Sequence, residues 1–485
     1  MKVIKYISIF GALLATAGFV ACDDDEDDYF ESDAQNSPIV VTDIYLENCE
    51  SKTPDRKISG TFVRVGQLIR LEGSGFYGMR KVYINGYDTY FNRATVSDNS
   101  MLVTINSKTP VTDADPEDRN KIRLVKDGAE YTYDNIVIRA AQPYVTSVSN
   151  TLPAAGTTVV CEGENLQEVT EVTLPGGVVV SSGIESDNKD GEWFSFVMPD
   201  GVTEGGSIAF VGANGQGKTP EYFNRKDGLI LNFDGVGAQG AWGGKDDEGN
   251  VKPTASMIYP DDLANDPLEQ NDKCFQLIPD RMVAAGGVQS GKPRAVECWT
   301  AGNDDADDDW SRFYSIFPAE TPAEEVAFQF DVYCPEPWSE TGVIQVNLYN
   351  NFNFSGPGTD DDNKANAVAI WCPWIDGADI VPFQTEGWQT VTIPFSDVLA
   401  EDMKPSESGC FGKFFGLTFQ DIVEARNTSS YRNFGMGLAN TDFTMGGVTV
   451  TSTAMDGNTK VYIDNWRLVP IKSFTISDYP EDDED

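Results

Sequence analysis

The sequence has no histidine, and this absence excludes several classes of function at once. Ser-His-Asp and Cys-His nucleophiles, histidine-ligated zinc and histidine acid–base catalysis all require an imidazole. Basic residues are also scarce, since 35 Lys and Arg stand against 77 Asp and Glu and the formal charge is −42. So acidic a surface repels phosphate backbones, and we expect no nucleic acid partner.

The sequence also lacks the motifs that most often bind a metal or cofactor. The eight cysteines include no C-x-x-C pair, which argues against structural zinc. We expect no cofactor, with structural calcium left open because calcium prefers carboxylate ligands. Its candidate ligands are the acidic runs at 304–309 and 360–363, for which solvated loops are the alternative interpretation, and the pair Asp234 and Asp464.

The first residues are typical of an exported lipoprotein. Lys2 and Lys5 precede an apolar run too short to span a bilayer, which indicates a signal peptide over residues 1–21. Cys22 follows a small residue, as in proteins whose cysteine takes up lipid after cleavage. Ordinary cleavage, with Cys22 an unmodified thiol, is the alternative. Six acidic residues come next and predict an extended acidic tether over residues 22–37.

The rest of the chain shows short alternating runs that end at Gly, Asn, Asp or Pro, so the predicted fold class is all-β. An internal repeat has a constant offset of 90 residues and predicts two copies of one small sandwich, over residues 38–141 and 142–225. We expect one large β-sandwich over 226–472 and an acidic tail over 473–485. The repeated positions are Gly66, Glu72, Gly73, Val82 and Gly86, which match Gly156, Glu162, Gly163, Val172 and Gly176.

Two stretches match the sequence patterns of nucleotide-binding motifs but lack the helix that each motif requires. Residues 212–219 fit the P-loop pattern, but Pro220 and a strand-like stretch follow where a phosphate site needs a helix. Residues 73–78 fit G-x-G-x-x-G, yet residues 81–85 alternate as a strand. We interpret both as hairpin turns in which Gly supplies a positive φ.

The pattern of residues 326–374 predicts a ligand-binding sheet face. On three strands, alternate residues are expected to point outward together: Gln329 and Asp331, then Gln345, Asn347 and Tyr349, then the alanines and Trp371. Amides donate to and accept from sugar hydroxyls, and rings cover the apolar side of a pyranose. The predicted carbohydrate-binding residues are Trp338, Trp371, Trp374, Tyr349, Asn347 and Gln345, with the tryptophans at the rim.

Core packing is the alternative for any single tryptophan. We expect it for Trp242, Trp388 and Trp466 and leave Trp299 and Trp310 unassigned.

Several motifs carry a resemblance to known families. Residues 73–76, 82–86 and 163–166 resemble immunoglobulin-like IPT/TIG modules. Together with the lipoprotein start, Trp371-Cys372-Pro373-Trp374 and residues 387–394, the whole chain is similar to the surface glycan-binding proteins of Bacteroidota polysaccharide utilisation loci, in particular the second binding protein of xyloglucan, β-glucan or mannan loci. The fold this implies is tandem IPT/TIG sandwiches followed by a jelly-roll-like carbohydrate-binding sandwich.

The same resemblance implies a function. It implies a non-catalytic, lipid-anchored protein on the cell surface of the outer membrane, which captures polysaccharide or oligosaccharide beside a TonB-dependent transporter. Trp338 and Trp371 take the role of aromatic platform, and Ile370 stands where a further ring is expected.

Two other classes remain as alternatives. A glycoside hydrolase needs only two carboxylates, but the glucanase pattern E-x-D-x-x-E occurs only at residues 26–31, inside the tether, and no second acid is expected beside Asp331. A cell-surface adhesin or scaffold that binds protein would also use an immunoglobulin-like stalk.

Overall fold

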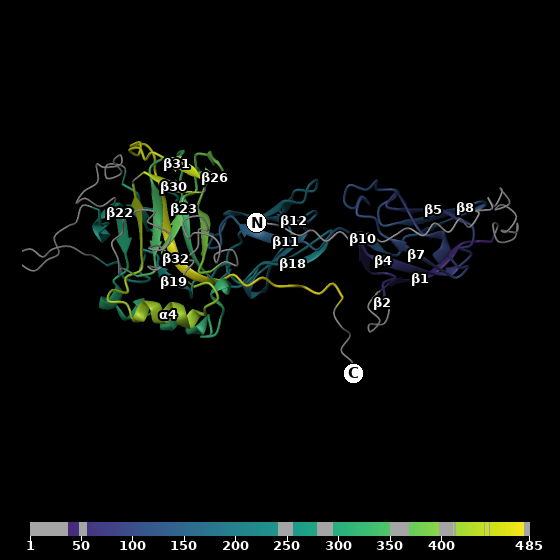
Figure 1. The fold of residues 1–485 in the computed structure, drawn as a ribbon, viewed down its shortest axis with the longest axis horizontal. Coiled ribbons are helices and arrows are strands. Elements are labelled where there is room, and N and C mark those ends of the chain that lie inside the picture. The colour runs from purple at the N-terminus through teal and green to yellow at the C-terminus, as the bar shows by residue number, and fades with distance from the viewer. Residues whose placement is uncertain are drawn as a thin grey trace, which may run out of the picture. The chain divides into compact units, whose positions relative to one another are not determined.

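The computed structural model describes residues 37–47, 56–240, 256–278, 294–349, 368–396, 411, 414–440, 442–445 and 447–479. The chain forms two compact units, Met1–Ala140 and Ala141–Asp485, which are described separately (Figure 1). Strands dominate the described residues of both units, so the predicted all-β class is confirmed.

The first unit contains two four-stranded sheets. One has the strand order β2-β1-β4-β7 and the other β6-β5-β8-β9, while β3 and β10 pair in parallel. Gly75, inside the G-x-G-x-x-G match, has a φ of +78°, and a Cβ there would lie 2.3 Å from the Pro38 carbonyl oxygen. A strand, β5, follows, so a turn with positive φ is confirmed. It is not the expected hairpin, because β4 and β5 belong to different sheets. The bounds are β1 (Val40–Leu46), β2 (Arg56–Lys57), β3 (Phe62–Arg64), β4 (Leu68–Ser74), β5 (Met79–Ile84), β6 (Tyr87–Thr89), β7 (Ser100–Thr104), β8 (Ile122–Lys126), β9 (Ala129–Tyr133) and β10 (Val137–Arg139).

The second unit begins with a small sandwich of two sheets, β11-β12-β16-β15 and β14-β13-β17-β18. Its β12 occupies the positions of β4 shifted by the 90-residue repeat. The P-loop match lies on the β17–β18 hairpin, as expected for a turn. The bounds are β11 (Tyr144–Val148), β12 (Thr158–Glu164), β13 (Glu171–Leu174), β14 (Val178–Val180), β15 (Glu185–Ser186), β16 (Trp193–Val197), β17 (Ala209–Gly212) and β18 (Gly215–Lys218).

The same unit continues into a large sandwich of two facing sheets. We call β20-β21-β32-β23-β28, with β19 beside β32, the front sheet, and β22-β29-β24-β25 the back sheet. The bounds are β19 (Leu229–Leu231), β20 (Ala264–Asn265), β21 (Lys273–Gln276), β22 (Arg294–Trp299), β23 (Val326–Tyr333), β24 (Val343–Asn347), β25 (Val368–Trp371), β28 (Gln389–Pro394), β29 (Gly435–Ala439) and β32 (Tyr462–Pro470). Short hairpins join β26 (Ile375–Asp376) to β27 (Asp379–Ile380) and β30 (Phe443–Met445) to β31 (Val448–Val450).

Aromatic side chains fill the space between the two sheets. Phe328 and Phe330 of β23 point inward, as their alternation predicts, and Phe328 packs against Phe434 with ring centroids 4.8 Å apart. Helix α4 (Phe419–Asn427) closes one end of the sandwich (Figure 1), where Phe419 joins the core. Its N-terminus is capped because the Asp421 carboxylate accepts the Thr418 N–H at 2.8 Å.

Candidate functional site

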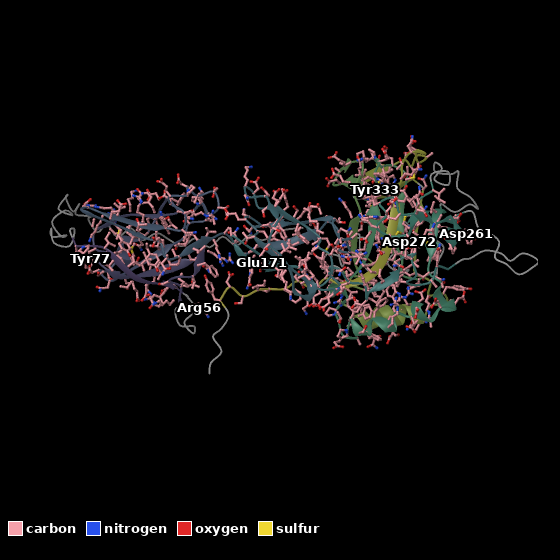
Figure 2. The ribbon with its side chains drawn as sticks, turned by 180° about the vertical axis from the view of Figure 1, so that it is seen from behind. Arg56, Tyr77, Glu171, Asp261, Asp272 and Tyr333 are labelled. Carbon is pink, nitrogen blue, oxygen red and sulfur yellow. The ribbon has the colours of Figure 1, made fainter. Side chains whose placement is uncertain are left out.

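The predicted ligand face does not exist as one surface, because β23 and β24 belong to opposite sheets. The chain crosses between the sheets after Tyr333, so the outward residues of β23 and those of β24 lie on opposite outer faces of the sandwich. Gln329 and Asp331 are buried on the outer face of the front sheet. Tyr333, labelled in Figure 2, lies at the end of β23, and its ring stacks on that of Tyr462 with centroids 6.1 Å apart.

The polar residues of the second strand are buried. Gln345, Asn347 and Tyr349 are 1%, 0% and 5% exposed, so their expected exposure is wrong. In the described part of the chain, the Gln345 Oε1 and both amide atoms of Asn347 have no hydrogen-bond partner. These amides share the outer face of the back sheet with Gly435 and Gly437 of β29, and they are too enclosed there to meet a long polysaccharide.

The third strand faces the other way from its predicted direction. Trp371 lies opposite Ile344 and Ala369 opposite Val346, so both point into the sandwich. Val368 and Ile370 share the outer face with Gln345 instead. Because side chains alternate with a period of two, an error of one residue in register exchanges the two faces of a strand.

Trp338 and Trp371 nevertheless come together at the end of β25. Their ring centroids are 6.0 Å apart, and the ring of Phe383 lies 5.5 Å from that of Trp371 and 6.4 Å from that of Trp338. Trp371 and Phe383 are partly exposed. Trp338 is 1% exposed and its Nε1 donates to the Thr341 hydroxyl, so its expected exposure is wrong. We call Trp338, Trp371 and Phe383 the rim cluster.

The rim cluster is held by backbone contacts. Trp338 and Phe383 exchange two backbone hydrogen bonds of 2.9 Å each, and the Val381 N–H donates to the Trp374 carbonyl at 3.0 Å. Ile380 and Val381 are 37% and 49% exposed, so an apolar edge continues the cluster toward solvent. Sequence reasoning missed Phe383 because it lies in a loop, where alternation gives no signal.

The other described tryptophans of the large sandwich are buried. Trp374 is fully buried against Phe443, with ring centroids 5.8 Å apart, so its predicted place at the rim is wrong. Trp388 and Trp466 are buried as expected. The unassigned Trp299 and Trp310 are buried as well, and Trp242 lies outside the described residues.

Asp331 has an acidic neighbour after all, because Asp464 lies opposite it on β32. Asp331 is paired with Arg467 at 2.8 Å, and the Asp464 carboxylate accepts from the Asn271 side chain at 2.9 Å. Burial raises the pKa of Asp464 well above its ordinary range. Both carboxylates are at most 1% exposed, so this pair is enclosed by protein and is not placed to attack a glycosidic bond.

The acidic stretch at 304–309 has structural partners. Asp305 and Asp309 cap short 3₁₀ helices, and Asp308 pairs with the buried Arg426 at 2.9 Å. Asp234 accepts backbone N–H groups of Asp272 and Lys273. In the ranges that the structure describes, no group of three or more acidic or cysteine side chains is arranged to hold a metal ion. Residues 360–363 are outside those ranges.

The described cysteines are all free and buried: Cys161, Cys274, Cys298, Cys334 and Cys372. Cys22, the acidic tether and the pattern at 26–31 lie outside the described residues. Among the helices of the described part, none combines the length and apolar character needed to cross a bilayer.

Comparisons with known proteins place this architecture among surface glycan-binding proteins. The fold resembles that of a surface glycan-binding protein from Prevotella bryantii, with a TM-score of 0.57 and 17% identity over 90% of this chain and 99% of that one. A relative from Bacteroides ovatus, described as an IPT/TIG domain-containing protein, is 21% identical over 406 residues, which cover 62% of this chain and 76% of the relative.

The family itself is identified by the large sandwich. Residues 223–470, just over half of the chain, match the family model described as the surface glycan-binding protein B xyloglucan binding domain. The chain therefore belongs to the surface glycan-binding protein B family, as the resemblance in the sequence predicts. The predicted start of the large sandwich, residue 226, lies close to the start of the match.

Proposed function

We propose that this protein is a non-catalytic cell-surface protein that binds a polysaccharide of the β-glucan, xyloglucan or mannan type for capture and uptake. Membership of a glycan-binding family supports the class of ligand. One observation carries the choice of site: within the matched domain, Trp371 and Phe383 are partly exposed rings in contact with each other. The neutral character of such glycans also suits a chain with a charge of −42.

The rim cluster replaces the predicted sheet face as the contact surface. Trp371 and Phe383 are its accessible rings, and the buried Trp338 supports them from inside. A ring that covers about 80 Å² of sugar contributes about 2 kcal/mol at ~25 cal/mol/Å². Two rings therefore support binding in the micromolar to millimolar range once ordering costs are included. Retention of a long polysaccharide then depends on many copies acting together.

Attachment to the cell surface is the second part of the proposal. Cys22, after its apolar leader, is the site proposed for lipid attachment to the outer membrane, and the bound glycan would be passed to a TonB-dependent transporter. Incorporation of labelled palmitate into the parent, and its loss in Cys22→Ser, would support the anchor. Equal labelling of both would place the lipid elsewhere or nowhere on this chain.

Affinity electrophoresis tests the binding function. Gels containing xyloglucan, mixed-linkage glucan, glucomannan, laminarin, pectin or starch should retard the parent with at least one neutral glycan, and Trp371→Ala should migrate faster than the parent. Trp193→Ala, at a tryptophan that is 37% exposed in the small sandwich of the second unit, is the matched control. Release of reducing sugar by pure protein would favour a hydrolase, and absence of retardation by every glycan would favour the protein-binding adhesin.

A further inference from the structure

The outer face of the front sheet is occupied by the small sandwich of the second unit. Thr151, in the loop that follows β11, donates its hydroxyl to the Gln329 Oε1 at 2.8 Å and accepts from the Arg467 guanidinium at 2.9 Å. All three side chains are at most 2% exposed. Arg467 in turn binds Asp331, and the Thr390 hydroxyl donates to Asp331 at 2.8 Å. One threonine of the small sandwich thus completes a buried polar network of the large one.

An apolar contact between the small and the large sandwich lies beside this polar network. Ala327 of β23 and Val469 of β32 are fully buried, and they belong to the hydrophobic core of the small sandwich, which also contains Phe223. The backbone joins the two parts as well, since the Thr390 N–H donates to the Ser149 carbonyl at 2.8 Å. A core shared by two sandwiches ties their stabilities together, because neither can bury these side chains alone.

The segment after β32 forms a third contact. It begins on the large sandwich, where the Ile471 N–H donates to the Glu325 carbonyl and Lys472 pairs with Glu325, each at 2.9 Å. It then follows the small sandwich (Figure 1): the Lys218 ammonium lies 4.3 Å from the centroid of the Phe474 ring, and the Gln142 amide donates to the Ile476 carbonyl at 2.6 Å. Lys218, the lysine of the P-loop match, contacts an aromatic ring here. We call residues 471–476 the strap.

We infer that the outer face of the front sheet is a permanent docking surface for the chain's own small sandwich, and that the functional binding unit extends from residue 141 through the strap. The family match, residues 223–470, covers only part of this unit. Arg467 and Asp331 would lose their enclosure without the small sandwich, and a buried ion pair is stable only while its hydrogen bonds are complete. The docked face is closed to glycan, which leaves the rim cluster as the binding surface.

The two sandwiches then form one cooperative unit, and their coupling can be measured without any ligand. Hydrogen exchange on the full chain compares the parent with Thr151→Val, which removes the hydroxyl and keeps the volume. We expect amide exchange in both β12 and β23 to rise by a similar factor of about 10, and the calorimetric transition of the second unit to remain single while its midpoint falls by a few degrees. Thr146→Val, at an exposed threonine of the same small sandwich, should change neither.

The strap gives a second variant in case Thr151→Val has too small an effect. Phe474→Ala removes the ring beside Lys218 and should also speed exchange in both sandwiches. The inference is overturned if the two sandwiches unfold in separate transitions. It is also overturned if Thr151→Val or Phe474→Ala speeds amide exchange in one sandwich and leaves the other unchanged. Loss of glycan binding plays no part in these outcomes, so they are independent of the proposed function.

Discussion

The rings of Trp371 and Phe383 meet at 85° with their centroids 5.5 Å apart, at the end of β25 and in the loop that follows β27. Both rings are partly exposed, and both rest on the buried Trp338. Rings at right angles do not form a flat platform, so this arrangement suits a single soluble chain that can turn between them better than a flat crystalline surface.

Replacing Trp371 by Ala is expected to raise the Kd for the best neutral glycan about 10- to 30-fold, the equivalent of about 1.4 to 2 kcal/mol. The change also removes a contact with Phe330, whose ring lies 5.2 Å away, so the folded fraction must be verified by circular dichroism. Isothermal titration measures the Kd. Trp371→Phe, which keeps a ring, should lose less affinity, and wild-type affinity in Trp371→Ala would contradict the proposed site.

Phe383→Ala is expected to weaken binding by a smaller factor, about 3- to 10-fold, because a phenyl ring covers less of a sugar than an indole does. The same titration measures it. Tyr431→Ala, at a 61% exposed ring that is not part of the rim cluster, is the control. A loss of affinity in the control as large as in Phe383→Ala would mean that binding does not depend on this cluster.

Trp338 is expected to stabilise the fold of the large sandwich and not to contact the sugar. Its side chain is buried, and its indole N–H is satisfied by Thr341, so Trp338→Ala should lower the free energy of unfolding by about 3–5 kcal/mol. Urea unfolding measures this change. Trp338→Phe should fold and retain most of the affinity. Strong loss of binding in a stably folded Trp338→Phe would show instead that this indole contacts the sugar directly.

The sequence predicts those features of the fold and site that depend on neighbouring residues, and it does not predict those that depend on residues far apart in the chain. The alternation of Phe328 and Phe330 is local and predicts their burial, and the 90-residue repeat aligns β12 with β4. The sheet to which β23 or β24 belongs is a non-local property that periodicity does not contain. The same is true of the register that turns Trp371 inward. Gln329 is predicted to face a ligand, but Thr151, which is far away in the sequence, covers it.

The five buried thiols are expected to resist alkylation in the native protein. Burial raises the pKa of Cys334 and of Cys372 to about 12, and it also raises the pKa of Cys161, Cys274 and Cys298. The reactive thiolate is therefore rare at pH 8. Iodoacetamide followed by peptide mapping should label these five cysteines only after denaturation. Native labelling of any of them would show that its surroundings open readily.

The buried Asp464 predicts a dependence of stability on pH. Its pKa is raised by burial and then by the charge of Asp331, so the folded state keeps a proton that the unfolded state has already lost. The stability associated with this proton is full below the ordinary pKa of a carboxyl group, and it is lost as the pH rises through the raised pKa. Asp464→Asn does not titrate, and its side-chain oxygen can still accept the backbone N–H of Asn465.

Asp464→Asn should therefore become more stable relative to the parent as the pH rises from 4 to 8. Urea unfolding at several pH values measures the difference. Asp379→Asn, at an exposed carboxylate on the β26–β27 hairpin, is the control and should show a much flatter difference. If the advantage of Asp464→Asn grows toward low pH instead, Asp464 is ionised in the folded protein and is stabilised there by its hydrogen bonds with Asn271 and Asn465.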